Sequence, residues 1–229
     1  VIEAFACQLP VDYESAMATR AVAPLWVNLE YLSAESWVES HHLLPSPHSR
    51  LPLTKYFFMP GFTAATGGLL RERDAMAPHA AQPASIASGG PVRVFLFGYN
   101  EAPAGALASG AAQASVDMTV SVLSEHLGAK LQHWRASRPE NAPEGAPMLE
   151  FGTRDFVPQE QFDSLLRDHD ILFVRGEDSF VRAQWARRPF IWHIYPQPDG
   201  AHWHKLDAFL DRYCVGLTAT SSQALRRMW

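Results

Sequence analysis

The sequence predicts an α/β fold made of two doubly wound domains, each built around a parallel sheet. Apolar segments of strand length alternate with helical segments along the 229 residues, and no hairpin signal separates the strands. A third observation is the stretch 77–90, where Ala, Pro, Ser and Gly dominate and apolar periodicity is almost lost. That composition is typical of a linker between domains. We therefore expect an N-terminal domain at 1–84, a linker at 85–91 and a C-terminal domain at 92–229.

The first domain is expected to alternate strands and helices. The expected elements are a strand at 1–9, a helix at 13–20, a strand at 24–30, a helix from Ser33 to about Glu39 and a strand at 55–59. Ser33 is suited to cap its helix, because its hydroxyl can accept from the first unpaired N–H groups. Between the last two elements, Pro45, Pro47 and Pro52 predict an extended, irregular passage.

The second domain continues the alternation. We expect a strand at 91–99, a helix at 111–127, a strand that contains Gln132 and Trp134, a helix at 159–167, a strand at 171–174, a further helix, a strand at 189–195 and a helix at 203–213. The helix at 111–127 is predicted because Val116, Val120, Leu123 and Leu127 fall near one helical face. The segment 137–147 is rich in proline and is expected to be a loop.

The stretch 170–196, DILFVRGEDSFVRAQWARRPFIWHIYP, is the most informative part of the chain because it predicts a complete βαβ unit. Residues 175–179 fall where the first strand ends and the helix begins, which is where open α/β sheets bind ligands. The first N–H groups of a helix lack partners within it and attract anions. Arg175 adds a permanent cation and Ser179 a hydroxyl. The turn is therefore a candidate phosphate site.

Glu177 and Asp178 allow two interpretations, since adjacent carboxylates would repel a phosphate. In one, they serve a second partner of the site. In the other, Asp178 caps the helix, Glu177 complements its dipole and Arg175 is an ordinary surface charge. Spacing alone does not separate these interpretations.

Bulk properties exclude several classes of protein. A net charge of −5 argues against a broad nucleic-acid interface, and no apolar run approaches the roughly 20 residues that span a membrane. Cys7 and Cys214 form no CxxC pair and are expected to be buried free thiols, which fits a cytoplasmic protein. His41 with His42, and His202 with His204, lack a third metal ligand at suitable spacing, so no metal site is expected.

Several long words of the sequence resemble one family. They are VIEAFACQLP, NLEYLSAESWVE, LPLTKYFF, PGFTAATGGLLRE, RGEDSF and PFIWHIYPQ. Together they resemble the protein-arginine rhamnosyltransferases that modify translation elongation factor P. The resemblance implies a GT-B-like fold, two Rossmann-like domains facing a cleft, with the N-terminal domain incomplete. It also implies an inverting enzyme that moves L-rhamnose from dTDP-β-L-rhamnose to an arginine of elongation factor P. No metal or cofactor is expected, because the sequence contains no HExxH, P-loop, GxGxxG or EF-hand motif.

The resemblance also assigns residues. It implies that Phe156 and Phe162 hold the thymine ring with Gln159 at its polar edge, that Phe97 and Tyr99 line the donor sugar side, and that Tyr195 contacts the nucleotide. Arg175, Asp178 and Ser179 complete the donor site in this assignment, in which Asp178 either caps the helix or touches phosphate. Glu177 is the catalytic candidate.

Arginine is a difficult acceptor because its guanidinium stays protonated and its lone pairs are delocalised. Carboxylates are needed to orient it and to receive a proton. The resemblance places the general base in an N-terminal segment that the chain lacks, together with a C-terminal end, so these residues alone are expected to be inactive. Two alternatives stay open: a nucleotide-sugar epimerase of the same architecture, and a non-catalytic module that binds a nucleotide or a protein.

Overall fold

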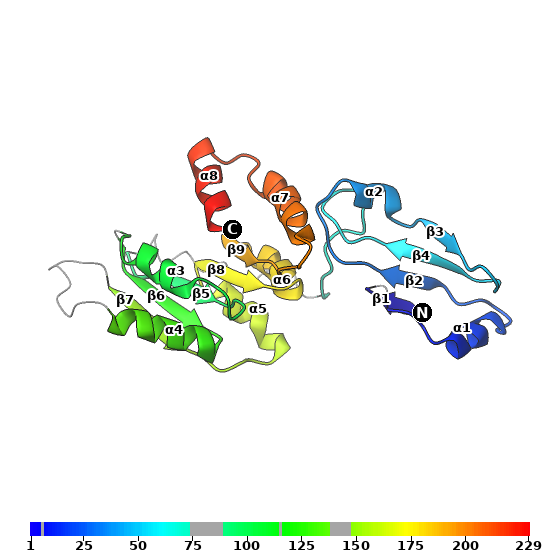
Figure 1. The fold of residues 1–229 in the computed structure, drawn as a ribbon, viewed down its shortest axis with the longest axis horizontal. Helices are drawn as coiled ribbons and strands as arrows, with labels where there is room; N and C mark the ends of the chain where they lie inside the picture. Colours follow the sequence, from blue (N-terminus) through cyan, green and yellow to red (C-terminus); the bar gives the residue numbers. More distant parts are fainter. Residues whose placement is uncertain (6, 74–88, 115, 138–147) are drawn as a thin grey trace. The chain divides into compact units, whose positions relative to one another are not determined.

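The computed structural model describes residues 1–5, 7–73, 89–114, 116–137 and 148–229. The chain divides into two compact units, each built around its own sheet (Figure 1). The first unit consists of Val1–Glu72 with Pro196–Ser222, and the second of Arg73–Tyr195 with Gln223–Trp229. Most of the expected linker, 85–88, and the expected loop at 138–147 lie outside the described residues.

The first unit contains a mixed sheet. Its elements are β1 (Ile2–Ala4), α1 (Val11–Ala18), β2 (Trp26–Leu29), α2 (Trp37–His41), β3 (Pro45–Pro47), β4 (Thr54–Phe58) and α7 (Ala201–Tyr213). In the described residues the strand order is β1-β2-β4-β3, and β1, β2 and β4 are parallel. β3 pairs antiparallel with β4, so the expectation of a wholly parallel sheet is wrong at this edge. A proline-rich strand is tolerated there because an edge strand needs fewer backbone donors.

The helix α7 explains why 196–222 group with the first unit, whereas the expected boundary placed all of 92–229 in the second. Phe209 packs on Phe62 with ring centroids 5.4 Å apart. Arg212 donates from Nε to the carbonyl of Ala34 at 3.2 Å. The chain thus returns to the first unit after β9, and this return carries no composition signal in the sequence.

The second unit contains a purely parallel sheet among its described residues, in the order β7-β6-β5-β8-β9 (Figure 1). Its elements are β5 (Val92–Leu96), α3 (Ala104–Ala111), β6 (Met118–Val122), α4 (Glu125–Ala136), β7 (Leu149–Thr153), α5 (Gln159–Arg167), β8 (Ile171–Arg175), α6 (Asp178–Ala186) and β9 (Phe190–His193). A last helix, α8 (Ala219–Met228), follows α7. The α/β class and the βαβ unit at 170–196 are confirmed.

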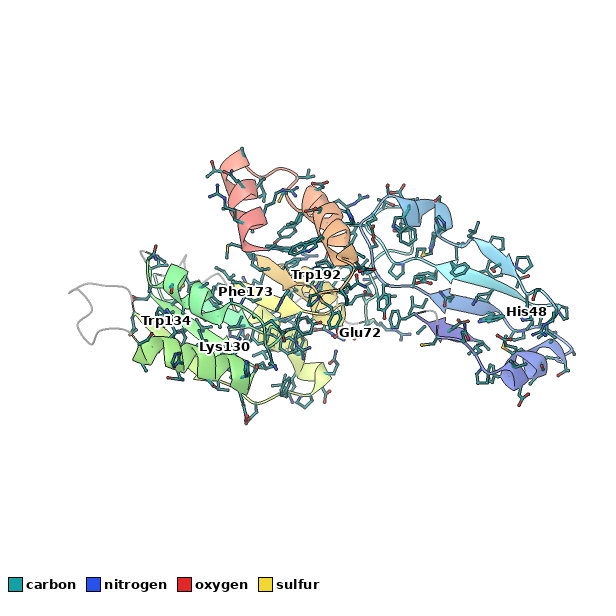
Figure 2. All side chains as sticks on the ribbon, viewed as in Figure 1. His48, Glu72, Lys130, Trp134, Phe173 and Trp192 are labelled. Carbon is teal, nitrogen blue, oxygen red and sulfur yellow. The ribbon has the colours of Figure 1, made fainter. Side chains whose placement is uncertain are left out.

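Two expected elements of this unit are wrong. Residues 118–122 form a strand inside the expected helix at 111–127, and Gln132 and Trp134 lie on α4 instead of on a strand. The apolar residues in MTVSV recur at every second position, which matches a strand as well as it matches one turn of a helix. Trp134, labelled in Figure 2, donates from Nε1 to the hydroxyl of Ser109 on α3 at 2.8 Å. β7 was not predicted.

The second sheet has an apolar core on both faces. On one face, residues of β5 and β6 such as Val94 and Val122 pack with Leu127 and Leu131 of α4. On the other, Phe95 contacts Phe162 of α5 at 6.0 Å. With both faces covered, the strands offer ligands only their ends. No helix within the described residues is long and apolar enough to cross a membrane.

Candidate functional site

The candidate site lies where the strand order of the second sheet reverses. β5 and β8 are neighbours, but the chain leaves β5 toward β6 on one side and leaves β8 toward β9 on the other. The loops after β5 and β8 therefore diverge and open a crevice at the carboxyl ends of the strands. Phe97 and Tyr99 follow β5, and Arg175 ends β8. The topology thus brings the expected residues from both strands to one place.

The turn after β8 is held in a fixed conformation. Gly176 has φ +65°, a left-handed conformation that favours glycine. A Cβ at this position would lie at ordinary contact distance, 3.4 Å, from the hydroxyl of Tyr99, so the requirement for glycine comes from φ and not from lack of space. The carbonyl of Gly176 accepts from Nε1 of Trp192, which is labelled in Figure 2, at 2.7 Å. These constraints set the direction in which α6 begins.

The backbone at the start of α6 is suited to bind an anion. Glu177 occupies the N-cap position without a side-chain capping bond, and its carbonyl accepts the N–H of Val181 at 3.0 Å. The N–H groups that precede Val181 in the first turn have no acceptor within the helix, as at every helix start, and they carry a partial positive charge. Asp178 is the first residue of the helix and its carboxylate accepts from Gln159 and Arg182, so the alternative in which Asp178 is the N-cap does not match this structure.

Ser179 serves the turn itself. Its hydroxyl donates to the carbonyl of Arg175 and accepts the N–H of Arg175 at 3.1 Å. The side chain is buried. In this structure the hydroxyl hydrogen is directed to the end of β8, so Ser179 links strand and helix while it lines the edge of the crevice.

Arg175 is stacked on two aromatic rings. Its guanidinium carbon lies 4.5 Å from the centre of the Phe97 ring and 4.9 Å from that of Tyr99. Rings on the guanidinium stabilise its charge and restrict its rotamers. Within the described parts of the chain, no carboxylate forms an ion pair with Arg175. The guanidinium is therefore held at the crevice by the two rings and not by an ion pair with one of these carboxylates.

Two adjoining hollows form the crevice, and all ten expected site residues line one or the other. The smaller, of about 300 Å³, is lined by Phe97, Phe156, Gln159, Phe162, Arg175, Glu177, Asp178 and Ser179, among others. The larger, of about 630 Å³, is lined by Tyr99 and Tyr195 and shares Phe97, Phe156 and Arg175 with the first. Arg175 thus stands between the two hollows.

The two phenylalanines of FVPQEQF differ in environment. Phe156 is 70% exposed and meets Phe97 edge-on at 6.3 Å. Phe162 is 8% exposed and packs between Phe95 and Phe97, at 6.0 and 5.9 Å. Only Phe156 offers a largely open ring, whereas Phe162 supports the floor of the smaller hollow.

Asp178 is held by its neighbours. Its Oδ2 accepts from Nε of Arg182 at 2.9 Å and from Nε2 of Gln159 at 3.0 Å. Arg182 is buried and also donates to Asp163 at 2.9 Å, which ties α6 to α5. Arg182 was not among the expected site residues, although its position four residues after Asp178 on a predicted helix is a usable signal.

The larger hollow also contains polar residues that the sequence analysis missed, among them Asn100, Glu101, Ser124, Glu125, Arg154 and Asp155. Several of them follow β6 and β7, the two strands that were assigned wrongly or not at all. Since ligands bind at the carboxyl ends of parallel strands, a correct assignment of these strands would have found the residues.

Histidines of both pairs form hydrogen bonds with nearby backbone groups, and both cysteines are free thiols. His42 accepts the N–H of Met59 at 3.1 Å, and His202 accepts that of Gln197 at 3.0 Å. Within the described residues, no group of three His, Cys, Asp or Glu side chains is placed to hold a metal ion. Both cysteines are free, but Cys7 is exposed and Cys214 is half-buried, so their expected burial is wrong.

The chain is similar in sequence to one protein family over its whole length. The chain matches, over residues 1–229, the family described as Elongation-Factor P (EF-P) rhamnosyltransferase EarP. It is 44% identical to the protein-arginine rhamnosyltransferase of Pseudomonas putida and 41% identical to that of Pseudomonas aeruginosa, covering 100% of this chain and 64% and 65% of those proteins. The Neisseria meningitidis protein is 38% identical, with 62% of its length covered. The chain therefore spans less than two thirds of these relatives.

This chain is also similar to a solved protein structure. That structure is described as the structural basis for EarP-mediated arginine glycosylation of translation elongation factor EF-P. The match covers 97% of this chain and 65% of the chain in that structure, with a TM-score of 0.61 and 30% sequence identity. The expected fold class, α/β with two Rossmann-like units of the GT-B type, is confirmed by this likeness.

Proposed function

The chain belongs to the elongation factor P rhamnosyltransferase family, and we propose that it carries the donor site of an inverting glycosyltransferase. In this proposal L-rhamnose moves from dTDP-β-L-rhamnose to an arginine side chain of elongation factor P. The observation that carries the proposal is the guanidinium of Arg175, which is stacked on Phe97 and Tyr99 beside the start of α6 and forms no ion pair with a carboxylate of the described residues. A cation and a helix start at one crevice suit a diphosphate.

The nucleotide is assigned to the smaller hollow. The exposed ring of Phe156 offers a face on which thymine can stack, while Phe162 supports Phe97 from below. Gln159 borders the same hollow, but in this structure its amide donates to Asp178, so reaching the base requires a different side-chain orientation. The sugar is assigned to the larger hollow beside Tyr99 and Tyr195.

Glu177 is proposed to act on the acceptor. It lines the smaller hollow immediately after Arg175 and Gly176, so it lies close to the position assigned to the diphosphate. A carboxylate there can hold the acceptor guanidinium by paired hydrogen bonds and orient its nitrogen toward the anomeric carbon. Asp178 is engaged by Arg182 and is assigned to the architecture of the site instead. We assign no general base among these residues.

Charge on the departing diphosphate is proposed to be stabilised by Arg175 and the first N–H groups of α6. These groups are already oriented by the stacked rings, by Gly176 and by Ser179, so little reorganisation is needed as charge develops. The proposed reaction uses no metal ion and no cofactor. We further propose a cytoplasmic enzyme whose partners are a dTDP-sugar and elongation factor P, without nucleic acid or membrane; the free thiols of Cys7 and Cys214 fit a reducing compartment.

Titration with dTDP, followed by amide shifts in NMR spectra, tests the donor site directly. Saturable binding is expected, with shifts concentrated at residues 97–99 and 175–180, and GDP is expected to bind more weakly because its larger base fits the smaller hollow less well. Equal affinity for dTDP and GDP, or shifts elsewhere, would contradict the assignment.

A transfer assay then separates the proposed activity from its alternatives. A protein that contains these residues together with the N-terminal and C-terminal segments expected from the family is incubated with dTDP-β-L-rhamnose and elongation factor P, and the mass of the acceptor is measured by mass spectrometry. A gain of one deoxyhexose on arginine that Glu177→Gln abolishes supports the proposal. Interconversion of the free nucleotide sugar without a gain in mass would indicate an epimerase. Unchanged function in Glu177→Gln, with ligand binding lost in Arg175→Ala, would indicate a binding module.

A further inference from the structure

His193 forms a contact across the crevice that the donor assignment does not use. It is the last residue of β9 and pairs in register with Arg175 on β8. Its Nδ1 accepts the backbone N–H of Tyr99 at 3.1 Å. Because β8 lies between β5 and β9, the imidazole reaches past the end of β8 to the segment that follows β5.

This hydrogen bond requires a neutral imidazole with its proton on Nε2, since Nδ1 must keep its lone pair. Burial lowers the pKa of His193, Glu101 opposes this effect, and the positive charge of Arg175 lowers the pKa further. Within the described part of the chain, Glu101 and Arg175 are the charged groups that shift the pKa of His193. The imidazole is therefore neutral at pH 7 and able to accept the N–H of Tyr99.

Tyr99 in turn is the centre of one wall of the crevice. Its ring contacts the guanidinium of Arg175 at 4.9 Å, the Tyr195 ring at 5.6 Å and the His193 ring at 5.1 Å. The chain has left β5 at this point, so the N–H of Tyr99 bonds to a side chain instead of a neighbouring strand. Removing the acceptor would leave this N–H unpaired in a half-buried position and release the ring.

Gly98 lies between the end of β5 and Tyr99 and is packed against Ala102 and His193. A Cβ on Gly98 would lie 3.0 Å from the Cβ of Ala102 and 3.4 Å from Nδ1 of His193. The tight contact would be with Ala102, while the imidazole would be at ordinary van der Waals distance, so Gly98 lies directly beside His193 in the turn that precedes Tyr99.

We propose that His193 is a positioning residue for donor binding: it fixes the backbone of Tyr99, and Tyr99 then holds Arg175 in the orientation that receives the diphosphate. The inference rests on the proposed function, because it concerns the same donor site. His193 itself is assigned no contact with the donor.

Matched substitutions of His193 test this role, with dTDP affinity measured by calorimetry. In His193→Asn the amide oxygen can lie near the position of Nδ1, whereas in His193→Gln the longer side chain carries its amide to the position of Nε2. His193→Asn is therefore expected to stay within about threefold of the original affinity, while His193→Gln and His193→Leu each weaken binding about tenfold. Equal losses in the Asn and Gln variants would overturn the inference. Because the Asn and Gln variants retain polarity, the comparison stands even where the Leu variant fails to fold.

A double-mutant cycle shows whether His193 acts through Tyr99. In a Tyr99→Ala background, His193→Leu is expected to cause less than a twofold further loss of dTDP affinity. A full tenfold loss in that background would mean that His193 does not act through the Tyr99 ring, and would overturn the inference.

Arg175→Ala separates this inference from the proposed function. If Arg175→Ala weakens dTDP binding but no His193 variant does, the positioning role fails and the donor site stands. If neither Arg175→Ala nor Phe156→Ala affects binding, the proposed donor site itself fails.

Discussion

Both units of the chain place a cation on aromatic rings, and Lys55 of the first unit and Arg175 of the second have opposite surroundings. In the first unit, Nζ of Lys55 lies 4.9 Å from the Trp26 ring and 3.2 Å from the carboxylate of buried Glu3. In the second, Arg175 lies on Phe97 and Tyr99 and borders two hollows, without a carboxylate partner among the described residues. Stacking on rings is common to both. The difference in charge compensation and in access is what distinguishes a structural cation from one suited to bind an anion.

The Lys55 cluster is closed upon itself. Glu3 is 4% exposed, accepts from Nε1 of Trp26 at 3.0 Å and accepts from Lys55 through both of its oxygens. Glu3 and Asn28 are register partners on β1 and β2, and Trp26 pairs with Lys55 of β4, so the cluster joins the three parallel strands. Its donors and acceptors are directed to one another, which leaves little capacity for a ligand.

Among the substitutions considered, replacing Lys55 is expected to have the largest effect, and that effect is a loss of stability. Lys55→Met leaves the carboxylate of Glu3 buried without its cation, which is expected to cost about 3 kcal/mol of the unfolding free energy of the first unit. Hydrogen exchange of the amides in β1, β2 and β4 measures this, and dTDP affinity should not change. The double variant Glu3→Gln with Lys55→Met should recover most of the loss, because it removes the unpaired charge. An equal loss in the double variant would show that the ion pair is not the cause.

At Arg175 we expect a loss of dTDP affinity with little loss of stability. Arg175→Ala should weaken dTDP binding about 100-fold, since it removes charge-assisted hydrogen bonds to the diphosphate, while the melting temperature changes little. Arg135→Ala is the matched control, because this exposed residue in the last turn of α4 removes the same charge from the same unit. If the two variants bind dTDP equally well, the contrast between the two cations has no functional meaning.

The turn after β8 in the second unit could be placed from the sequence because its signals are local. Arg175, Gly176 and Glu177 follow a continuous apolar strand and precede a helix, and that order alone places them at the carboxyl end of a parallel sheet. The family resemblance then added Phe156 and the other aromatic residues, all of which line the two hollows.

What the sequence did not predict depends on contacts between distant segments. The short run MTVSV supports a strand or a helical turn equally, so the polar residues after β6 and β7 were missed. The closed cluster of Glu3 and Lys55 joins residues 52 positions apart and has no spacing pattern. Nor does composition show that α7 returns to the first unit, since its packing against Phe62 is a tertiary contact.

The two phenylalanines of FVPQEQF extend the comparison within the second unit. Phe156→Ala is expected to weaken dTDP binding about tenfold, because one exposed stacking surface is lost, with no change in stability. Phe162→Leu is expected to lower the melting temperature by a few degrees and to affect binding less, because that ring is part of the core beneath Phe97. Calorimetry and thermal unfolding on both variants measure the two quantities. A larger loss of affinity in Phe162→Leu than in Phe156→Ala would reverse this assignment.

The smallest effect is expected from the titration of His169, which should change the stability of the second unit only. Burial lowers the pKa of His169, with smaller effects of the same sign from Arg154 and Arg93, while its hydrogen bond with the carbonyl of Leu165 and the charge of Asp168 oppose the shift. A lowered pKa means that, below about pH 6.5, the unfolded chain binds a proton more readily than the folded unit. The stability of the second unit should therefore decline as pH falls below that value, by at most about 1.4 kcal/mol per pH unit for this one group. His169→Gln should flatten the decline in the amides of β5 and β8 and leave that of the first unit unchanged. An identical pH profile in the variant would assign the acid sensitivity to other groups.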